Sequence, residues 1–335
     1  MNVLLWHVHG SWTTAFVEGR HRVLLPVLPD RGPEGRGRAR TWNWPPNAVE
    51  VAPREAAEAE VDIVILQRPQ ELHTLAERWL GGRRPGRDVP AVYLEHNAPQ
   101  GRIADMRHPA ADRPDLTLAH VTHFNDLFWD AGSTPTRVIE HGIPDPGYRY
   151  TGAIPRAAVA INEARRRGRV TGTDLLERFA QAAPLDLFGM DAEALGGRGD
   201  VPQARMHDEL ARRRVYLHPI RWTSLGLALL EAMHLGMPVV ALATTEAPEA
   251  IPPHAGMVST RVDILQAALR RLVRDPDAAR EAGRHARAAA LARYGLQRFL
   301  ADWDALLAQV VAEHRFRLRR PAPAARTPAH HRRAA

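Results

Sequence analysis

The feature that most constrains this chain is a repeated alternation of short apolar runs with segments of helical periodicity. The runs are apolar on both faces, which is typical of parallel strands covered by helices on both sides. The sequence therefore predicts an α/β protein with a parallel sheet in each half. The expected strands are 2–8, 23–28, 61–66, 89–94, 116–121 and 137–139, then 159–161, 185–188, 215–217, 238–243 and 257–259. The expected helices are 70–80, 174–182, 225–235, 265–274 and 277–293.

Breaks in this alternation divide the chain. The segment 143–155 holds three Pro and two Gly residues and ends the first set of strands. Because a domain takes roughly 100–200 residues, we expect two Rossmann-like domains, 1–150 and 151–295. A further helix, 296–316, is expected to pack back on the first domain. The Pro-, Ala- and Arg-rich tail 317–335 is expected to be disordered. Segments 31–40 and 42–47, rich in Gly, Arg, Pro and Trp, are expected to be loops.

Composition excludes several classes of protein. There is no Cys, which excludes disulfides and thiolate metal sites. The first ten residues, MNVLLWHVHG, lack a basic region, and no apolar run approaches the roughly 20 residues of a membrane span. A cytoplasmic location is expected.

All 45 basic residues are Arg, and the formal net charge is +7. The Arg residues are scattered and accompany no nucleic-acid-binding motif, so no nucleic-acid partner is expected. A weak contact of the basic tail with a membrane surface stays open.

The segment 215–240, VYLHPIRWTSLGLALLEAMHLGMPVV, is the most informative. A strand ends at His218, Thr223 or Ser224 is expected to cap a helix, and Gly236 ends that helix. A helix entered from the carboxyl end of a parallel strand directs unpaired N–H groups at a ligand, and such an end suits phosphate. Gly226 in the first turn would let the ligand approach closely. Glu231, in an apolar helix, needs a polar partner.

The stretch SLGLALLEAM followed by HLGMPVV resembles the donor-site signature of the retaining group 1 glycosyltransferases, which are similar to glycosyltransferase family 4. The resemblance covers the chain loosely and residues 202–273 most closely. It implies the GT-B fold, in which two Rossmann-like domains face each other across a cleft. It further implies that Glu231 binds the ribose hydroxyls of the donor, and that the backbone of Ser224, Leu225 and Gly226 faces the donor diphosphate.

The chain departs from the family pattern at two positions. The family's first signature Glu, eight residues before the second, is Thr223 here, and a Lys after the first strand of the second domain is Thr171. The Arg residues of that loop could replace the missing charge. The donor-side candidates outside the signature backbone are Arg165, Arg167, Arg169, His218, Thr223 and Glu246.

In the first domain, polar residues follow expected strands at the same sheet edge. His9 and Gly10 follow the first strand, and His96 and Asn97 follow 89–94. They are the candidates for the acceptor side, and His96 is the candidate catalytic residue. His120 and His123 also end a strand, but no third ligand at metal-binding spacing accompanies either His-rich stretch, so no metal is expected.

The resemblance implies transfer of a sugar, with retention and without a metal or other cofactor. The donor would be a nucleotide diphosphate sugar, and the acceptor a small molecule, a lipid or a glycan. Two alternatives stay open: a nucleotide-sugar epimerase of the same fold, and a nucleotide-sugar-binding protein without activity. A dinucleotide-dependent oxidoreductase is disfavoured because no G-x-G-x-x-G follows a strand.

Overall fold

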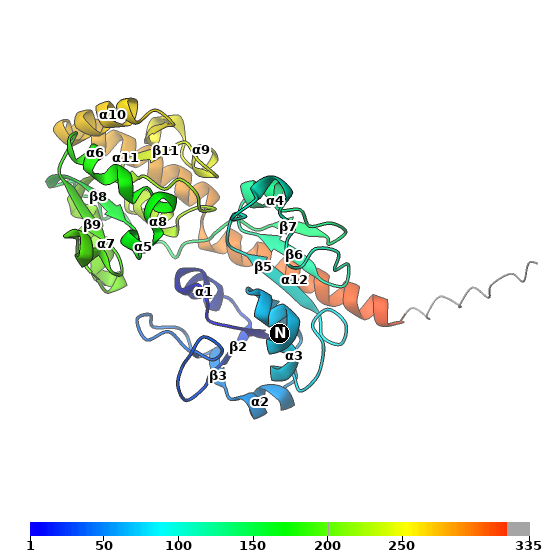
Figure 1. Ribbon diagram of the computed structural model, residues 1–335. Helices are drawn as coiled ribbons and strands as arrows, with labels where there is room; N and C mark the ends of the chain where they lie inside the picture. Colours follow the sequence, from blue (N-terminus) through cyan, green and yellow to red (C-terminus); the bar gives the residue numbers. More distant parts are fainter. Residues whose placement is uncertain (200, 320–335) are drawn as a thin grey trace, which may run out of the picture.

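A computed structural model describes residues 1–199 and 201–319 of the protein. Its strands form two parallel sheets, one in each half of the chain (Figure 1). The first sheet has the order β3-β2-β1-β4-β5-β6-β7. Its strands are β1 (Asn2–Leu5), β2 (Arg22–Pro26), β3 (Ala48–Val51), β4 (Ile63–Leu66), β5 (Ala91–Glu95), β6 (Thr117–His120) and β7 (Thr136–Val138).

The second sheet has the order β12-β11-β10-β8-β9. Its strands are β8 (Ile154–Ala160), β9 (Leu185–Phe188), β10 (Arg213–His218), β11 (Val239–Leu242) and β12 (Gly256–Ser259). Every neighbouring pair in both sheets is parallel. The predicted α/β class with two Rossmann-like sheets is confirmed.

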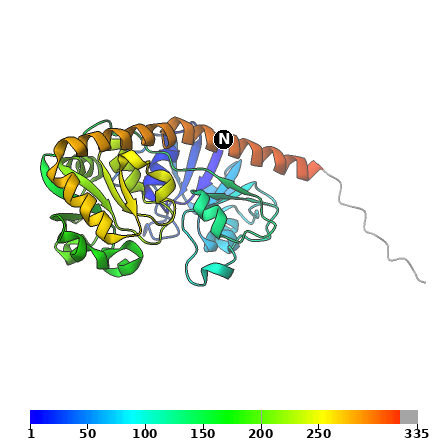
Figure 2. The same cartoon turned by 90° about the horizontal axis from the view of Figure 1, so that it is seen from above.

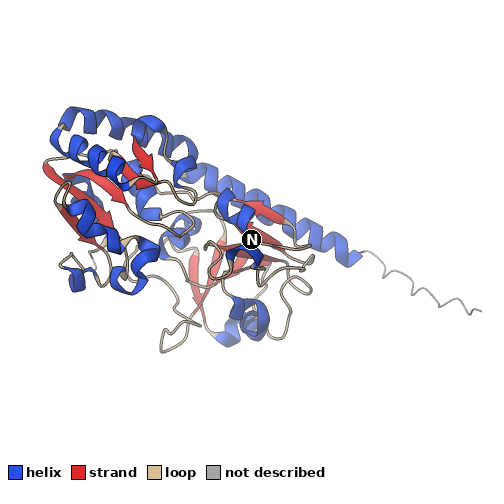
Figure 3. Cartoon of the chain, turned by 45° about the horizontal axis from the view of Figure 1, so that its top comes forward, coloured by secondary structure: helices blue, strands red, loops and turns tan. Residues whose placement is uncertain are grey.

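Helices lie on both sides of each sheet (Figure 3). Those of the first half are α1 (Gly10–Val17), α2 (Pro53–Glu58), η1 (Glu71–Leu75), α3 (Ala76–Trp79), η2 (Ile103–Asp105) and α4 (His123–Phe128). Those of the second half are α5 (Ala164–Arg167), η3 (Gly168–Thr171), η4 (Thr173–Leu175), α6 (Leu176–Ala180), η5 (Ala192–Leu195), α7 (Gln203–Arg212), α8 (Leu227–Leu235), α9 (Ala247–Ala250), η6 (Pro253–Ala255), α10 (Val262–Arg274), α11 (Pro276–Arg293) and α12 (Leu296–Arg319).

The apolar pattern of the strands explains this layering. Alternate residues of β1, β2, β4 and β5 face α1 and α12 on one side of the first sheet, and the others face α2 and α3. In the second sheet one face packs on α8 and α11 and the other on α6 and α10. Because both faces of each sheet are covered, ligands have access mainly to the strand ends and the loops that follow them.

The chain crosses between the two halves at two neighbouring places. Ile143 and Gly295 form a parallel bridge, and the amide of Ile143 donates to the carbonyl of Tyr294 at 2.9 Å. After the second crossing, α12 runs back along the first domain (Figure 2) and buries Phe299 and Trp303 in that domain's core. Within the described ranges, no helix has the length and apolarity needed to cross a bilayer.

Three expectations about local structure were wrong. Residues 48–51 form β3, although only the loop 42–47 before it was expected; the alternation AVEV is too short to stand out beside Pro and Trp residues. The last helix continues to Arg319, so Arg317–Arg319 belong to it, and the rest of the expected disordered tail lies outside the described residues. The start of α8 also differs from the expected cap, as described below.

Candidate functional site

The candidate site of the second domain lies where the strand order changes direction. The neighbours β8 and β10 lead into loops on opposite sides of the sheet, and such a point opens a crevice at the carboxyl ends of the strands. The two loops contact each other. The amides of Arg221 and Trp222, after β10, both donate to the carbonyl of Val170, after β8, at 3.0 and 3.1 Å.

Gly172 fixes the packing of these loops. Its φ of +73° is a left-handed conformation, and a side chain there would run into the carbonyl of Pro219. Thr171 beside it is fully buried and bonds the Gly168 carbonyl at 3.2 Å. The position of the family's missing Lys is therefore a packed structural position in this chain, and Thr171 offers no charge to a ligand.

The three arginines proposed for the diphosphate differ in their surroundings. Arg169 is exposed and pairs with Asp174 at 3.2 Å. Arg221 pairs with the same carboxylate. Arg165 is exposed, and neither its guanidinium group nor that of Arg167 donates a hydrogen bond to a described group. Burial lowers the pKa of Arg167, and Arg166 adds to the effect. Arg165 and Arg167 are thus the two that keep their donors for a ligand.

The start of α8 is formed by backbone. Gly226 is the residue before the first turn, and no side chain caps the helix. The predicted cap by Thr223 or Ser224 was wrong, because the helix starts later and Ser224 Oγ donates instead to the carbonyl of His96 at 2.5 Å. The amides of Gly226, Leu227 and Ala228 donate no hydrogen bond to any described group, so they remain open to a ligand.

His218, the last residue of β10, packs directly on Gly226. A methyl group built on Gly226 would lie 2.8 Å from Cε1 of His218, so the close approach requires Gly. Burial lowers the pKa of His218 to about 4, which makes the ring neutral at neutral pH. Its Nδ1 is buried without a hydrogen-bond partner among the described residues. A buried polar atom of this kind, next to open amides, suits a ligand-binding surface.

Glu231 lies in α8 and is 8% exposed. Its Oε2 lies 3.4 Å from Nε2 of His207 in α7, and its charge contributes to the raised pKa of Tyr216. The polar partner expected for this buried carboxylate therefore includes His207, which the sequence analysis did not single out. The sequence near residue 231 gives no sign that a residue 24 positions earlier, on another helix, contacts Glu231.

Glu246 has a different environment. Its backbone amide donates to the carbonyl of Ser224 at 3.4 Å, so it lies beside the start of α8. Its carboxylate accepts from the amide of Phe124 at 2.9 Å and pairs with Arg293 at 3.2 Å. Burial raises its pKa. The side chain thus connects the two domains. Thr223 is half-buried and lies one residue from Ser224.

In the first domain the strand order changes direction between β1 and β4, and the acceptor-side candidates gather there. The rings of His9 and His96 lie 3.9 Å apart, and that of His141 lies 6.5 Å from His96. Burial lowers the pKa of His9 to about 4, that of His141 to about 3, and that of His96 well below its ordinary value. The three rings form a neutral imidazole cluster. The sequence analysis did not single out His141.

Contacts within the first domain orient His96. Its Nε2 donates to Oε1 of Gln67 at 3.0 Å, which leaves Nδ1 unprotonated in the neutral ring. Asn97 is held by Glu95, whose carboxylate accepts from the Asn97 amide at 2.7 Å. Gly10 starts α1, where a side chain would meet the ring of Trp42.

The other histidines considered in the sequence do not join this cluster. His120 is fully buried on β6 and lies 3.7 Å from Asp126, and His123 is exposed at the start of α4. Residues 1–199 and 201–319 contain no group of three or more His, Asp or Glu residues placed to hold a metal ion.

The two halves of the site contact each other. Besides the Ser224–His96 and Glu246–Phe124 bonds, Nε1 of Trp222 donates to the carbonyl of Pro99 at 2.7 Å. Trp222 also packs edge-on against Phe124. The loop between β10 and α8 therefore reaches across to the loop after β5, and the donor-side and acceptor-side candidates share one interdomain region.

Comparison with known proteins identifies the second domain. Residues 157–275 match the family model "Glycosyl transferases group 1". Over these residues the second domain is similar to the group 1 glycosyltransferases. The match contains Glu231 and Gly226 together with the loops that follow β8 and β10. No protein of curated function matches the chain by sequence.

Solved structures show that the whole chain has the GT-B fold. A sucrose-phosphate synthase from Thermosynechococcus elongatus matches with a TM-score of 0.71 at 14% identity, over 93% of this chain and 100% of that one. HepE from Anabaena, in complex with UDP, matches with a TM-score of 0.66 at 14% identity, over 92% of this chain and 100% of that one. AviGT4, a glycosyltransferase involved in avilamycin A biosynthesis, matches with a TM-score of 0.62 at 18% identity, over 93% of this chain and 98% of that one. The predicted GT-B fold is confirmed.

Proposed function

We propose that this protein is a glycosyltransferase that moves a sugar from a nucleoside diphosphate sugar to an acceptor, with retention at the anomeric carbon and without a metal. The observation that carries the proposal is the start of α8. Three amides there, those of Gly226, Leu227 and Ala228, have no described acceptor and lie at the point where the sheet order reverses. Open amides at a helix start bind phosphate well. Glu231 on the same helix supplies a carboxylate for the ribose hydroxyls.

The groups around these amides suit a diphosphate. Arg165 and Arg167 have guanidinium groups without described partners, and Nδ1 of His218 is unpaired against Gly226. Guanidinium groups and backbone amides bind phosphate oxygens through charge-assisted hydrogen bonds. UDP is the first nucleotide to test, because HepE binds it in a similar fold.

The chemistry rests on electrostatic stabilisation. As the sugar leaves, negative charge develops on the diphosphate, and fixed amides and guanidinium groups stabilise that charge without rearranging. Nδ1 of His96 can accept a hydrogen bond from the acceptor hydroxyl, because Nε2 already donates to Gln67. Contact between the domains at Ser224 and Glu246 excludes water from the region.

A second candidate function is epimerisation of the nucleotide sugar. The cluster of His9, His96 and His141 favours it, since neutral imidazoles can accept a proton from a sugar carbon or hydroxyl. Incubation with a UDP-sugar separates the two reactions. Transfer releases UDP in proportion to product, whereas epimerisation interconverts two UDP-sugars without releasing the nucleotide.

The experiment that tests the donor site is a thermal-shift screen with UDP, GDP, TDP and ADP. Ligand at 100 times its dissociation constant adds about 2.7 kcal/mol of stability. A shift with one nucleotide that is strongly reduced in Glu231→Ala supports the proposal, and no shift with any of the four contradicts it. Binding without UDP release or epimerisation over a panel of acceptors would instead favour the non-catalytic alternative. Activity that survives EDTA and a product with the donor's anomeric configuration, read by NMR, test metal independence and retention.

A further inference from the structure

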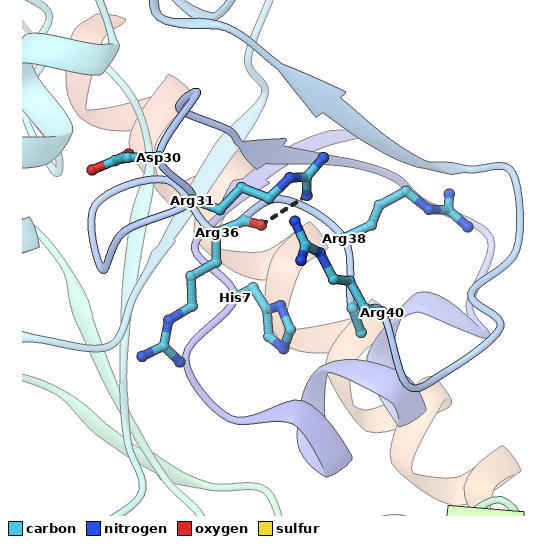
Figure 4. Close-up of a pocket in the computed structure, with 7 residues that line it drawn as sticks. His7, Asp30, Arg31, Arg36, Arg38 and Arg40 are labelled. Carbon is cyan, nitrogen blue, oxygen red and sulfur yellow. Dashed lines mark hydrogen bonds between the residues drawn. The ribbon is translucent and has the colours of Figure 1, made fainter. Parts of the chain in front are cut away.

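A basic pocket lies beside the acceptor side of the site, in the loop between β2 and β3. His7, Asp30, Arg31, Arg36, Arg38 and Arg40 line a cavity of about 360 Å³ (Figure 4). The chain places four Arg residues within ten positions, and three of them alternate at 36, 38 and 40. The proposed donor site does not use this pocket.

Two of the four arginines bond groups of their own domain and stabilise the loop. Arg31 makes a two-pronged pair with Glu50, with Nη–Oε distances of 2.8 and 3.1 Å. Arg38 donates to the carbonyls of Trp44, Pro45 and Ala48 and so holds the loop to β3. These contacts keep the pocket in shape.

The other two arginines are free to bind a ligand. Arg36 and Arg40 are exposed, and neither guanidinium group donates to any group in the described part of the chain. Figure 4 shows their side chains near the His7 ring, while Asp30 points away from them. The carboxylate of Asp30 accepts from the amide of Gly32 at 3.2 Å, and that of Glu50 is held by Arg31. The pocket therefore carries an excess of positive charge that its carboxylates do not neutralise.

The pocket connects with the transfer site through the end of β1. Nδ1 of His7 donates to the carbonyl of Gly37 at 3.1 Å, and the His7 ring packs on Trp44 at 4.8 Å. The charge of Arg36 acts on both His7 and His9 and contributes to the lowered pKa of each, after burial. The His9 ring lies 3.9 Å from that of His96, so the pocket, lined by His7, and the imidazole cluster both adjoin the end of β1.

We propose that Arg36 and Arg40 form a phosphate subsite for the acceptor. The hydroxyl that receives the sugar then belongs to a phosphate-bearing molecule. The inference rests on the proposed function and specifies its substrate class. The planar fork of a guanidinium group matches two oxygens of a phosphate, and the pocket offers two such groups without described partners. A phosphate bound there holds the acceptor while its hydroxyl lies near His96. The phosphate can come from a soluble phosphomonoester or from a lipid headgroup.

The test is isothermal titration with glycerol 3-phosphate, with the protein saturated with UDP so that the donor diphosphate site is filled. We expect binding to wild type that is at least about ten-fold weaker in Arg36→Ala/Arg40→Ala. The matched control is Arg54→Ala/Arg102→Ala, which removes two exposed arginines of the same domain outside the pocket. Equal weakening in the control, or no binding of glycerol 3-phosphate or of vesicles, overturns the proposal.

A parallel experiment separates the two sources of phosphate. Sedimentation with phosphatidylglycerol vesicles that is lost in the double variant, without binding of glycerol 3-phosphate, assigns the subsite to a lipid headgroup. A second readout does not depend on variants: titration of wild-type His7 by NMR should show a higher pKa with phosphate bound, because the anion offsets the charge of Arg36. An unchanged pKa for His7 at saturating glycerol 3-phosphate places that ligand outside the pocket and overturns the proposal.

The same samples keep the two proposals apart. UDP affinity, measured first, reports on the donor site alone, and we expect the double variant to keep it within about two-fold because Arg36 and Arg40 lie in the other domain. If wild type does not bind UDP, the proposed function is contradicted. If wild type binds UDP but the double variant and the control bind glycerol 3-phosphate equally well, only the acceptor subsite is contradicted.

Discussion

The second domain builds its part of the site from backbone, whereas the first domain builds its part from side chains. Around the start of α8 the chemistry lies in three open amides and in glycines that allow close approach, with Glu231 as the buried carboxylate. Around the ends of β1 and β5 it lies in the rings of His9, His96 and His141 and in the arginines beside them. In the proposed function, the backbone would bind the diphosphate that donors share, and the side chains would be free to differ with the acceptor.

The largest effect expected within this comparison is that of Glu231→Ala. If Glu231 accepts hydrogen bonds from the ribose hydroxyls as proposed, its removal costs about 2 kcal/mol, so the affinity for UDP should fall about 30-fold. Isothermal titration with UDP measures it. Glu249→Ala, which removes an exposed carboxylate of the same domain, is the control and should leave the affinity unchanged. Equal affinity in wild type and Glu231→Ala would place the ribose elsewhere.

The next effect concerns the backbone part of the site. In Gly226→Ala the added methyl group would lie 2.8 Å from Cε1 of His218, so the ring or the helix start must move. We expect UDP affinity to fall about 10-fold, which corresponds to about 1.4 kcal/mol.

A double-mutant cycle with His218→Ala shows whether that contact is the cause. If the clash with the ring produces the loss, adding Gly226→Ala to His218→Ala costs little further affinity. A full additional 10-fold loss in the double variant would show that the methyl group obstructs the ligand itself.

The same contrast explains what the sequence could predict. The backbone part lies in one continuous segment whose glycine spacing and apolar strand are visible in the sequence, so Gly226 and Glu231 could be singled out. The imidazole cluster combines residues 9, 96 and 141, which only the strand order brings together. His207 lies near Glu231 because α7 packs on α8, a contact with no local signature. Strand β3 was missed because AVEV is too short and partly polar to show a pattern.

A smaller effect is expected from Thr223→Glu, which introduces the carboxylate that this chain lacks at the family position. Thr223 is half-buried next to Ser224, and the proposed function puts the new side chain at the donor sugar and Glu231 at the ribose. We expect the preference among UDP-sugars, measured as ratios of kcat/KM, to change by about five-fold, or about 1 kcal/mol. The affinity for UDP itself should change less than two-fold, and an equal loss for UDP and UDP-sugars would contradict this placement of residue 223.

The smallest effect concerns Glu246, the carboxylate that joins the two domains. Burial raises its pKa, and this outweighs the amide of Phe124 and the charge of Arg293; Glu140 adds to the rise and His123 opposes it. Between the ordinary value for glutamate, about 4.3, and its raised value, the folded protein binds more protons at this site than the unfolded chain. The stability linked to Glu246 is therefore complete below the ordinary value and is lost as the pH rises through the raised one.

Glu246→Gln isolates this contribution, because the amide oxygen can still accept from Phe124 but does not titrate. The Tm of wild type relative to Glu246→Gln should fall by about 2 °C as the pH rises through that window and then stay level. Glu249→Gln serves as the control for an exposed carboxylate of the same domain. A Tm difference that rises with pH would mean that Arg293 and the Phe124 amide dominate. Glu246 would then be charged in the folded protein, paired with Arg293 of its own domain and accepting from the Phe124 amide of the other.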